Sequence, residues 1–97
     1  MTAFETVLAG IWAENLQLDD VELSSNFFEL GGQSIDAIEI ISEIKDIFEV
    51  SLSLQALNKT PTITELAASL NTTATEEKRL EEIAQLMLST MDSNLLD

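Results

Sequence analysis

The 97-residue chain contains no cysteine and no histidine, and both absences limit what it can do. Without cysteine the chain can form no disulfide, and without either residue it cannot build a zinc site of the usual Cys/His type. The same absences exclude Ser-His-Asp and Cys-His nucleophilic systems and a histidine general base. A domain of this size also has little room for an enclosed catalytic cavity. We therefore expect that the protein is not an enzyme.

Basic residues are scarce as well. The chain has 18 acidic residues and four basic ones, so its formal net charge is -14. Nucleic acid and anionic membrane surfaces would be repelled, because binding to either depends on Lys and Arg. A basic surface on another protein would be attracted, and its encounter rate raised. The charge predicts no nucleic-acid partner, no membrane partner, and docking to basic patches on other proteins.

No run of about 18 apolar residues occurs, so the sequence predicts no membrane-spanning helix. The N-terminal segment MTAFETVLAGIWAENL lacks the positively charged region and the small-residue cleavage site of a signal peptide. A cytoplasmic location is the default expectation, and we expect a monomer. Because the chain starts at Met1, just before the first expected helix, we expect a free-standing protein rather than a slice of a larger one.

Proline, glycine and aromatic residues are few: one Pro, three Gly and 5% aromatics. The chain is 45% hydrophobic and rich in Leu, Ile and Ala, which favours helices over a sheet sandwich. Apolar residues recur at helical spacing in five segments. The segments are residues 2–16, 34–48, about 54–57, 62–70 and 76–91.

These segments predict an all-α fold. We expect a small four-helix bundle, with three long helices and one short one, and an additional C-terminal helix. Residues 1–71 would form the main domain, and residues 72–97 a linker and a C-terminal amphipathic helix. We expect the linker to occupy residues 71–75 and the tail, residues 92–97, to fray.

Polar residues mark the helix starts. Thr2 with Glu5, and Thr62 with Glu65, have the spacing of capping boxes. Ser34 is the expected N-cap of the helix over residues 34–48. The apolar stripe of that helix is expected to contain Ile35, Ile38, Ile41, Ile44 and Phe48, widened by Ala37, Ile40 and Ile47.

The long connection over residues 17–33 mixes turn formers with apolar residues, among them Val21, Phe27 and Phe28. So much apolar content predicts that the connection packs on the bundle rather than being disordered. It ends in Gly31-Gly32, which favours tight backbone geometry just before a helix.

The segment LGGQSI, residues 30–35, joins this connection to the most strongly amphipathic helix. Taken alone, Gly-Gly-x-Ser indicates no more than a glycine-rich turn that ends in a serine cap. The context is more specific, because a turn-rich loop precedes the serine and a helix with an acidic face follows it.

The stretch from Phe4 to Leu70 resembles the carrier proteins of nonribosomal peptide and polyketide assembly lines. Three blocks carry the resemblance: NFFELGGQSI at residues 26–35, FEVSLSL at 48–54 and TPTITELA at 60–67. The first block is similar to the carrier signature around the modified serine. The details are closer to peptidyl carriers than to fatty-acid carriers, which more often have Asp-Ser-Leu at the site. Gln33 departs from the pattern, since His or Asp is commoner there.

The resemblance implies a fold of acyl-carrier-protein type and a 4′-phosphopantetheine arm, taken from coenzyme A, on Ser34. The arm would hold aminoacyl or acyl groups as thioesters for biosynthetic enzymes. The implied partners are a phosphopantetheinyl transferase and adenylating, condensing and releasing (thioesterase-type) enzymes. Elementary chemistry agrees, because a helix N-terminus favours a phosphate. Gly31 and Gly32 would keep side chains away from the transferase, and the working thiol would belong to the arm rather than to the protein.

Residues around the serine are candidates for docking partner enzymes: Gln33, Ile35, Asp36, Ile38, Glu39, Glu43 and Leu57. The acids among them, together with Asp46, lie three and four residues apart and would form an acidic ridge. Asp36 would also stabilise the helix, as an acid in its first turn. A solvated face is the simpler interpretation of the other acids, and core positions are the simpler interpretation of Ile38 and Leu57.

Other interpretations stay open. A fatty-acid or polyketide-type acyl carrier would differ only in cargo, and a cofactor-free acidic interaction module would not need Ser34. A hydrolase that uses Ser34 would lack a base. The C-terminal helix is equally well explained as an extra helix on the bundle and as a docking or self-association surface with Met87, Leu88 and Met91.

Overall fold

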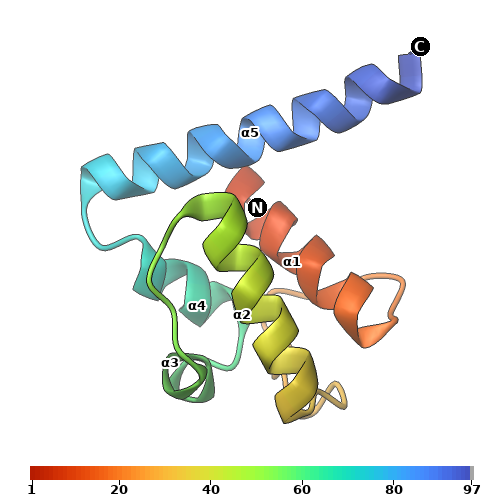
Figure 1. Cartoon of the computed structure of the whole chain (residues 1–97), viewed down its shortest axis with the longest axis vertical. Coiled ribbons are helices and arrows are strands. Elements are labelled where there is room, and N and C mark those ends of the chain that lie inside the picture. Colours follow the sequence, from red (N-terminus) through yellow and green to blue (C-terminus); the bar gives the residue numbers. More distant parts are fainter. Residues whose placement is uncertain (97) are drawn as a thin grey trace.

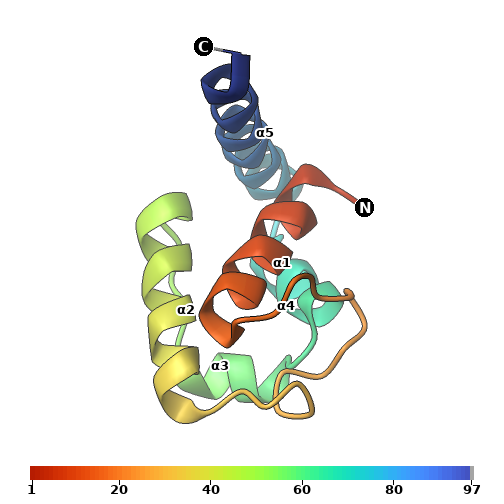
Figure 2. The same cartoon turned by 90° about the vertical axis from the view of Figure 1, so that its right-hand side faces the viewer.

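A computed structural model of the chain describes the backbone of residues 1–96 and the side chains of residues 1–90. The described part is helical, and the predicted all-α class is confirmed (Figure 1). The helices are α1 (Ala3–Leu16), α2 (Ser34–Phe48), α3 (Leu54–Lys59), α4 (Ile63–Leu70) and α5 (Ala74–Leu96). α1 lies at the centre and contacts α2, α4 and α5, while α3 packs against α2 (Figure 2).

The capping box predicted for α1 is present. The Thr2 hydroxyl oxygen accepts from the Glu5 N–H at 3.0 Å, and the Glu5 carboxylate accepts from the Thr2 N–H at 2.8 Å. The two bonds satisfy backbone donors that a helix start leaves free. α1 ends where Gln17 turns into the left-handed region at φ 58°.

The second predicted capping box is only half formed. The Thr62 hydroxyl oxygen accepts from the Glu65 N–H at 3.2 Å, as expected. The Glu65 carboxylate, however, accepts from the Thr62 hydroxyl at 2.9 Å instead of from the Thr62 backbone N–H. α4 is therefore capped through the threonine side chain alone.

The long connection over residues 17–33 packs on the bundle, as predicted. Val21 and Phe27 are buried in the core. The Phe27 N–H donates to the carbonyl of Pro61 at 2.7 Å, and the Thr64 N–H donates to that of Leu23 at 3.2 Å. These bonds hold the connection against the start of α4.

Aromatic rings anchor the core at both ends of α1. Phe4 meets Phe48 of α2 edge to face with ring centroids 4.9 Å apart, and Trp12 meets Phe27 in the same way at 5.3 Å. All four side chains are almost completely buried. Edge-to-face ring contacts stabilise the fold beyond the burial of apolar surface, and they fix how α1, α2 and the long connection meet.

The C-terminal helix α5 is part of this core. It starts at Ala74, two residues before the predicted start, because Thr73 caps it by accepting from the Glu76 N–H at 3.0 Å. The linker is accordingly shorter than expected. Leu80 and Ala84 are fully buried. The helix is assigned through Leu96 rather than to about Met91. The side chain of Met91 and the fraying expected of residues 92–97 lie outside the described residues.

Two charged side chains of α5 attach it to other helices. The Glu81 carboxylate accepts from the backbone N–H groups of Ala3 and Phe4, at 3.0 and 2.9 Å. Burial opposes ionisation of Glu81, but the two N–H groups and the Gln85 amide outweigh it, so the pKa of Glu81 lies below its ordinary value. Arg79 donates to the carbonyl of Phe48 at the end of α2, at 2.8 Å.

Arg79 also pairs with Glu76 through two hydrogen bonds, of 2.6 and 2.8 Å. The hydrogen bonds to Arg79 lower the pKa of Glu76, and those to Glu76 raise the pKa of Arg79. Among the described residues, no helix is both long and apolar enough to cross a membrane.

Candidate attachment site at the start of α2

Ser34 lies at the beginning of α2 with its side chain exposed. The prediction that Ser34 is the N-cap is wrong by one residue, because Gln33 has the extended cap conformation (φ -118°, ψ 170°) and Ser34 is the first helical residue. The hydroxyl is therefore not committed to capping as a cap residue would be. The N–H groups of this first turn have no partner within the helix, so the surroundings of Ser34 favour an anion.

Asp36 closes the turn on which Ser34 stands. Its carboxylate accepts from the backbone N–H of Gln33 at 2.9 Å, across the serine. An acid in the first turn is also favoured by the helix dipole. Asp36, expected to dock partners, thus holds the local backbone and is half-buried, whereas Gln33 is exposed and stays a predicted docking residue.

The two glycines before the site are required for different reasons. Gly31 has φ +92°, a conformation that residues with a side chain rarely adopt, although the space around it is open. A Cβ at Gly32 would overlap the buried ring of Phe27. Both glycines therefore shape the turn that presents Ser34, in addition to leaving room above it.

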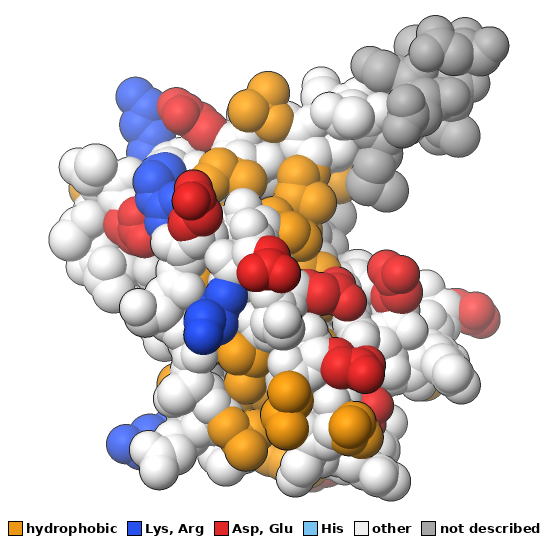
Figure 3. All heavy atoms as spheres, in the orientation of Figure 1, with side chains coloured by type: hydrophobic (Ala, Val, Ile, Leu, Met, Phe, Trp, Pro, Cys, Tyr) orange, Lys and Arg blue, Asp and Glu red, His pale blue; other side chains and the backbone are white. Residues whose placement is uncertain are grey.

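Large apolar side chains are exposed beside Ser34 on α2 and on two neighbouring elements. The exposed fractions are 63% for Ile35 and 55% for Ile38, both on α2. Phe28 of the long connection (47%) and Leu54 of α3 (37%) are exposed as well. Apolar side chains gather over α2 and α3 in the lower half of Figure 3. A solvent-exposed group of large apolar side chains on a small domain indicates an interaction surface.

The predicted apolar stripe of α2 was therefore too wide. The buried residues are Ala37, Ile40, Ile41, Ile44 and Phe48, whereas Ile35 and Ile38 lie outside this stripe. The prediction of Leu57 as a docking residue is wrong. Its side chain is completely buried beneath α3 and cannot touch a partner without unfolding.

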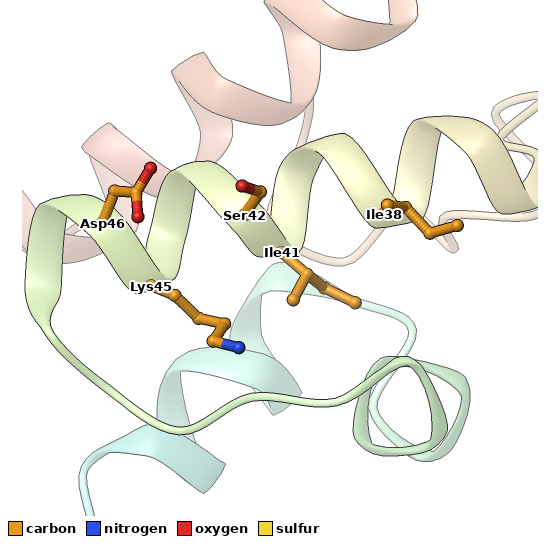
Figure 4. A pocket seen from close by; sticks show the side chains of 5 residues that line it. All are labelled: Ile38, Ile41, Ser42, Lys45 and Asp46. Atoms are coloured by element: carbon orange, nitrogen blue, oxygen red, sulfur yellow. The ribbon is translucent and has the colours of Figure 1, made fainter.

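A shallow hollow follows the exposed face of α2. Figure 4 shows Ile38, Ile41 and Lys45 pointing to the side of α2 that faces α3, at positions 38, 41 and 45 that share one face of a helix. Ser42 and Asp46 complete its lining. The apolar surface near Ser34 thus continues along the helix toward one of the four cations of the chain.

The acidic ridge is present only in part. Glu39 and Asp46 are exposed on α2. Glu43 is half-buried and turned toward α1, where its carboxylate accepts from the Asn15 amide at 3.2 Å. Glu39 and Asp46 therefore remain available to a basic partner, and Glu43 is held by α1.

The arrangement offers an exposed hydroxyl for attachment. In the part of the chain that the structure describes, no three His, Cys, Asp or Glu side chains form a potential metal site. The hydroxyl of Ser34 can form a phosphodiester, whose charge the first turn of α2 would stabilise. The residues present therefore fit a covalently attached phosphopantetheine. A small helical bundle with such a serine at a helix start is the architecture of a carrier domain.

Comparison with known proteins agrees with this class. Residues 6–70 match the family model described as "Phosphopantetheine attachment site", and the chain belongs to this family of phosphopantetheine-dependent carriers. It is 47% identical to malpinin synthetase of Mortierella alpina over 68 residues, which are 70% of this chain and 1% of the synthetase. The chain spans about 1% of the length of the first curated relatives that it matches.

Solved structures of similar fold include a carrier protein. The type-II acyl carrier protein BlmI of Streptomyces verticillus, involved in bleomycin biosynthesis, is 35% identical with a TM-score of 0.69. The match covers 71% of this chain and 83% of BlmI. A docking-domain complex of the Pax nonribosomal peptide synthetase is 33% identical with a TM-score of 0.64, covering 80% of this chain and 81% of that one.

Two exposed residues of the site were missed by the sequence analysis. Phe28 follows the buried Phe27, and nothing in the sequence distinguishes which of the two rings points inward. Leu54 precedes the buried Leu57 by one helical turn, so periodicity places both on one face. Only the position of the short α3 at the edge of the bundle leaves Leu54 exposed.

Proposed function

We propose that Ser34 carries the phosphopantetheine arm and that the chain presents aminoacyl or acyl thioesters to the enzymes of a nonribosomal peptide assembly line. The observation that carries the proposal is the exposed serine at the first position of α2, framed by Gly31, Gly32 and exposed apolar side chains. The arm supplies a terminal thiol on which acyl groups are held as thioesters. The synthetase similarity supports the peptide branch of carrier chemistry.

The residues of the chain have distinct roles in this proposal. Ser34 provides the oxygen of the phosphodiester, and the first turn of α2 stabilises its negative charge. Asp36 and the two glycines hold that turn. Ile35 and Ile38, at 63% and 55% exposed, provide an apolar docking surface close to the serine. The exposure or hydrogen bonding of each residue supports the role proposed for it.

Protein partners supply the chemistry. The chain has no histidine or cysteine, so it would neither activate Ser34 nor cleave a thioester by itself. A phosphopantetheinyl transferase would activate the hydroxyl, and adenylating, condensing and releasing enzymes would act on the cargo. Glu39 and Asp46 would attract basic partner surfaces, because the net charge is -14. A cytoplasmic location is part of the proposal, because the N-terminal segment lacks the features of a signal peptide.

The test is the intact mass after incubation with coenzyme A and a broad-specificity phosphopantetheinyl transferase. We expect the native chain and Ser42→Ala to gain one phosphopantetheine, and Ser34→Ala to gain none. Ser42 is the matched control, because it is an exposed serine on the same helix. A folded native chain that gains no mass would refute the proposal. Loading of the arm by an adenylating enzyme with an amino acid, rather than by an acyl-activating enzyme, then tests the peptide branch.

A further inference from the structure

Side chains of α1 and α5 line an apolar groove. The two helices meet at the end of the bundle away from the start of α2 (Figures 1 and 2). Its volume is about 370 Å³. Val7 and Ile11 of α1 line one side, and Met87 and Leu88 of α5 line the other. The groove is therefore separate from the surface around Ser34.

Gly10 of α1 also lines this groove. It is exposed, and a Cβ at this position would meet no atom within 4 Å. Packing within the chain therefore does not require glycine here, although glycine destabilises the interior of a helix relative to alanine. The missing side chain leaves the backbone of α1 open to close approach by another element.

Apolar surface continues from the groove over α5. Met87 lines both the groove and a neighbouring hollow that contains Ile83 and Leu86. Leu86 is 68% exposed, the largest exposed fraction of any leucine among the described side chains. Methionine side chains are flexible and adapt to different partners. Together the groove and hollow form a surface large enough to receive the apolar face of a helix.

Acidic side chains predominate around this surface. No Lys or Arg occurs in residues 1–44 or in residues 80–97. Glu14 lines the groove, and Glu82 lines a hollow on the other side of Leu86. Figure 3 shows acidic side chains directly beside the apolar ones where α5 meets the bundle. A second copy of the chain would bring another net charge of -14 and be repelled.

We propose that the groove between α1 and α5 is a docking site for a basic amphipathic helix of a partner protein. Apolar residues three and four positions apart on that helix would enter the groove over Gly10, and helices approach most closely where side chains are small. Its Lys and Arg residues would face Glu14 and Glu82. Binding there would leave Ser34 and the exposed face of α2 free for other enzymes.

A nuclear magnetic resonance titration of the isotope-labelled full chain tests this site. The probe is a synthetic amphipathic helix of Leu and Lys, and the control is a peptide of the same composition in scrambled order. We expect the largest shift changes at Val7, Gly10, Ile11, Met87 and Leu88, and weaker binding of the scrambled peptide.

Two variants make the test specific. Gly10→Leu fills the groove with a side chain, and Met87→Lys replaces an apolar lining side chain by a basic one. Each variant should weaken binding of the probe peptide at least tenfold. Ala68→Leu, at an exposed small residue of α4, is the matched control and should bind as the native chain does. The proposal would be overturned if both groove variants bound the probe peptide as tightly as the native chain does. It would also be overturned if the largest chemical-shift changes lay along α2. Sedimentation that shows a native dimer abolished by Met87→Lys would overturn it as well, because a second copy would then occupy the groove.

Discussion

The carboxylate of Glu81 in α5 accepts a hydrogen bond of 2.9 Å from the backbone N–H of Phe4 in α1, a residue 77 positions earlier in the chain. The same carboxylate accepts from Ala3. The first backbone N–H groups of a helix have no partner within the helix. The Glu81 carboxylate supplies that partner for the N–H groups of Ala3 and Phe4. Since Leu80 and Ala84 of α5 are also buried in the core, we infer that the folding unit extends beyond residues 6–70, which match the carrier family.

Replacing Glu81 by Gln should lower the free energy of unfolding by about 1 kcal/mol, because bonds to a charged acceptor become bonds to a neutral one. Glu82→Gln is the matched control, since Glu82 is exposed and should change stability by less than about 0.5 kcal/mol. Urea unfolding at pH 7 measures both. Equal stability of the two variants would contradict the role assigned to Glu81.

The contribution of Glu81 should depend on pH. Its pKa is lower in the folded protein than its ordinary value of 4.5, so the charged form favours folding. The stabilisation is complete well above pH 4.5 and is lost as the pH falls through the lowered pKa. The stability difference between the native chain and Glu81→Gln should therefore be constant from about pH 7 to 5.5 and shrink below 4.5. A difference that grows on acidification would have the wrong sign.

The two glycines before Ser34 should respond differently to alanine. Gly32→Ala forces a Cβ into the ring of Phe27, which lies against Trp12, and should cost about 1–3 kcal/mol. Trp12 is the only tryptophan, so its fluorescence should change as Phe27 moves. Gly31→Ala should cost about 1 kcal/mol through its positive φ, without altering the emission. An unchanged spectrum in Gly32→Ala would argue against the close approach of Phe27.

The contrast between Leu57 and Ile38 separates stability from docking. Leu57→Ala leaves a cavity in the core and should cost about 2–5 kcal/mol. Ile38→Ala, at a side chain that is 55% exposed, should change stability by less than about 0.5 kcal/mol and slow loading by the transferase. Thermal unfolding and the rate of coenzyme A-dependent mass gain measure the two effects. A stable Leu57→Ala variant would contradict the burial of this residue.

The exposed acids of α2 should act on the rate of encounter. Glu39→Lys should slow transferase loading about threefold or more at low salt, and the difference should vanish near 0.5 M salt, where about 4 Å of Debye length remains. Glu77→Lys, at an exposed acid of α5, makes the same change in net charge away from the site. Equal slowing by both variants would show that net charge alone, and not the location of Glu39, controls the encounter.

Local signals in the sequence were sufficient to predict most of the fold. The capping pair Thr2–Glu5 and the repeat of apolar residues placed α1, α2 and α4 within one residue of their observed ends. The start of α5 was predicted too late, because Thr73 was assigned to a linker although it caps the helix. Threonine occurs both in connecting turns and as a helix N-cap, and only the position of the following helix decides between the two.

The site was harder to predict than the fold, because exposure depends on tertiary packing. Ile35 and Ile38 have the same spacing as core residues, and the direction of α2 over α1 determines that they face solvent. Helical spacing favoured core positions for both docking candidates Leu57 and Ile38; this is correct for Leu57, which is buried, and wrong for Ile38, which is 55% exposed. The long-range bond between Glu81 and Phe4 has no local sequence signature, since acids at exposed helix positions are common.

Localisation of the attached group tests the central claim most directly. After loading with coenzyme A and the transferase, cleavage before aspartate separates residues 20–35, which contain Ser34, from residues 36–45, which contain Ser42. Fragmentation of the first peptide then distinguishes Ser34 from Ser24 and Ser25. We expect the phosphopantetheine on Ser34 alone. A modified Ser42, or a modified Ser24 or Ser25, would contradict the assignment of Ser34 as the attachment site.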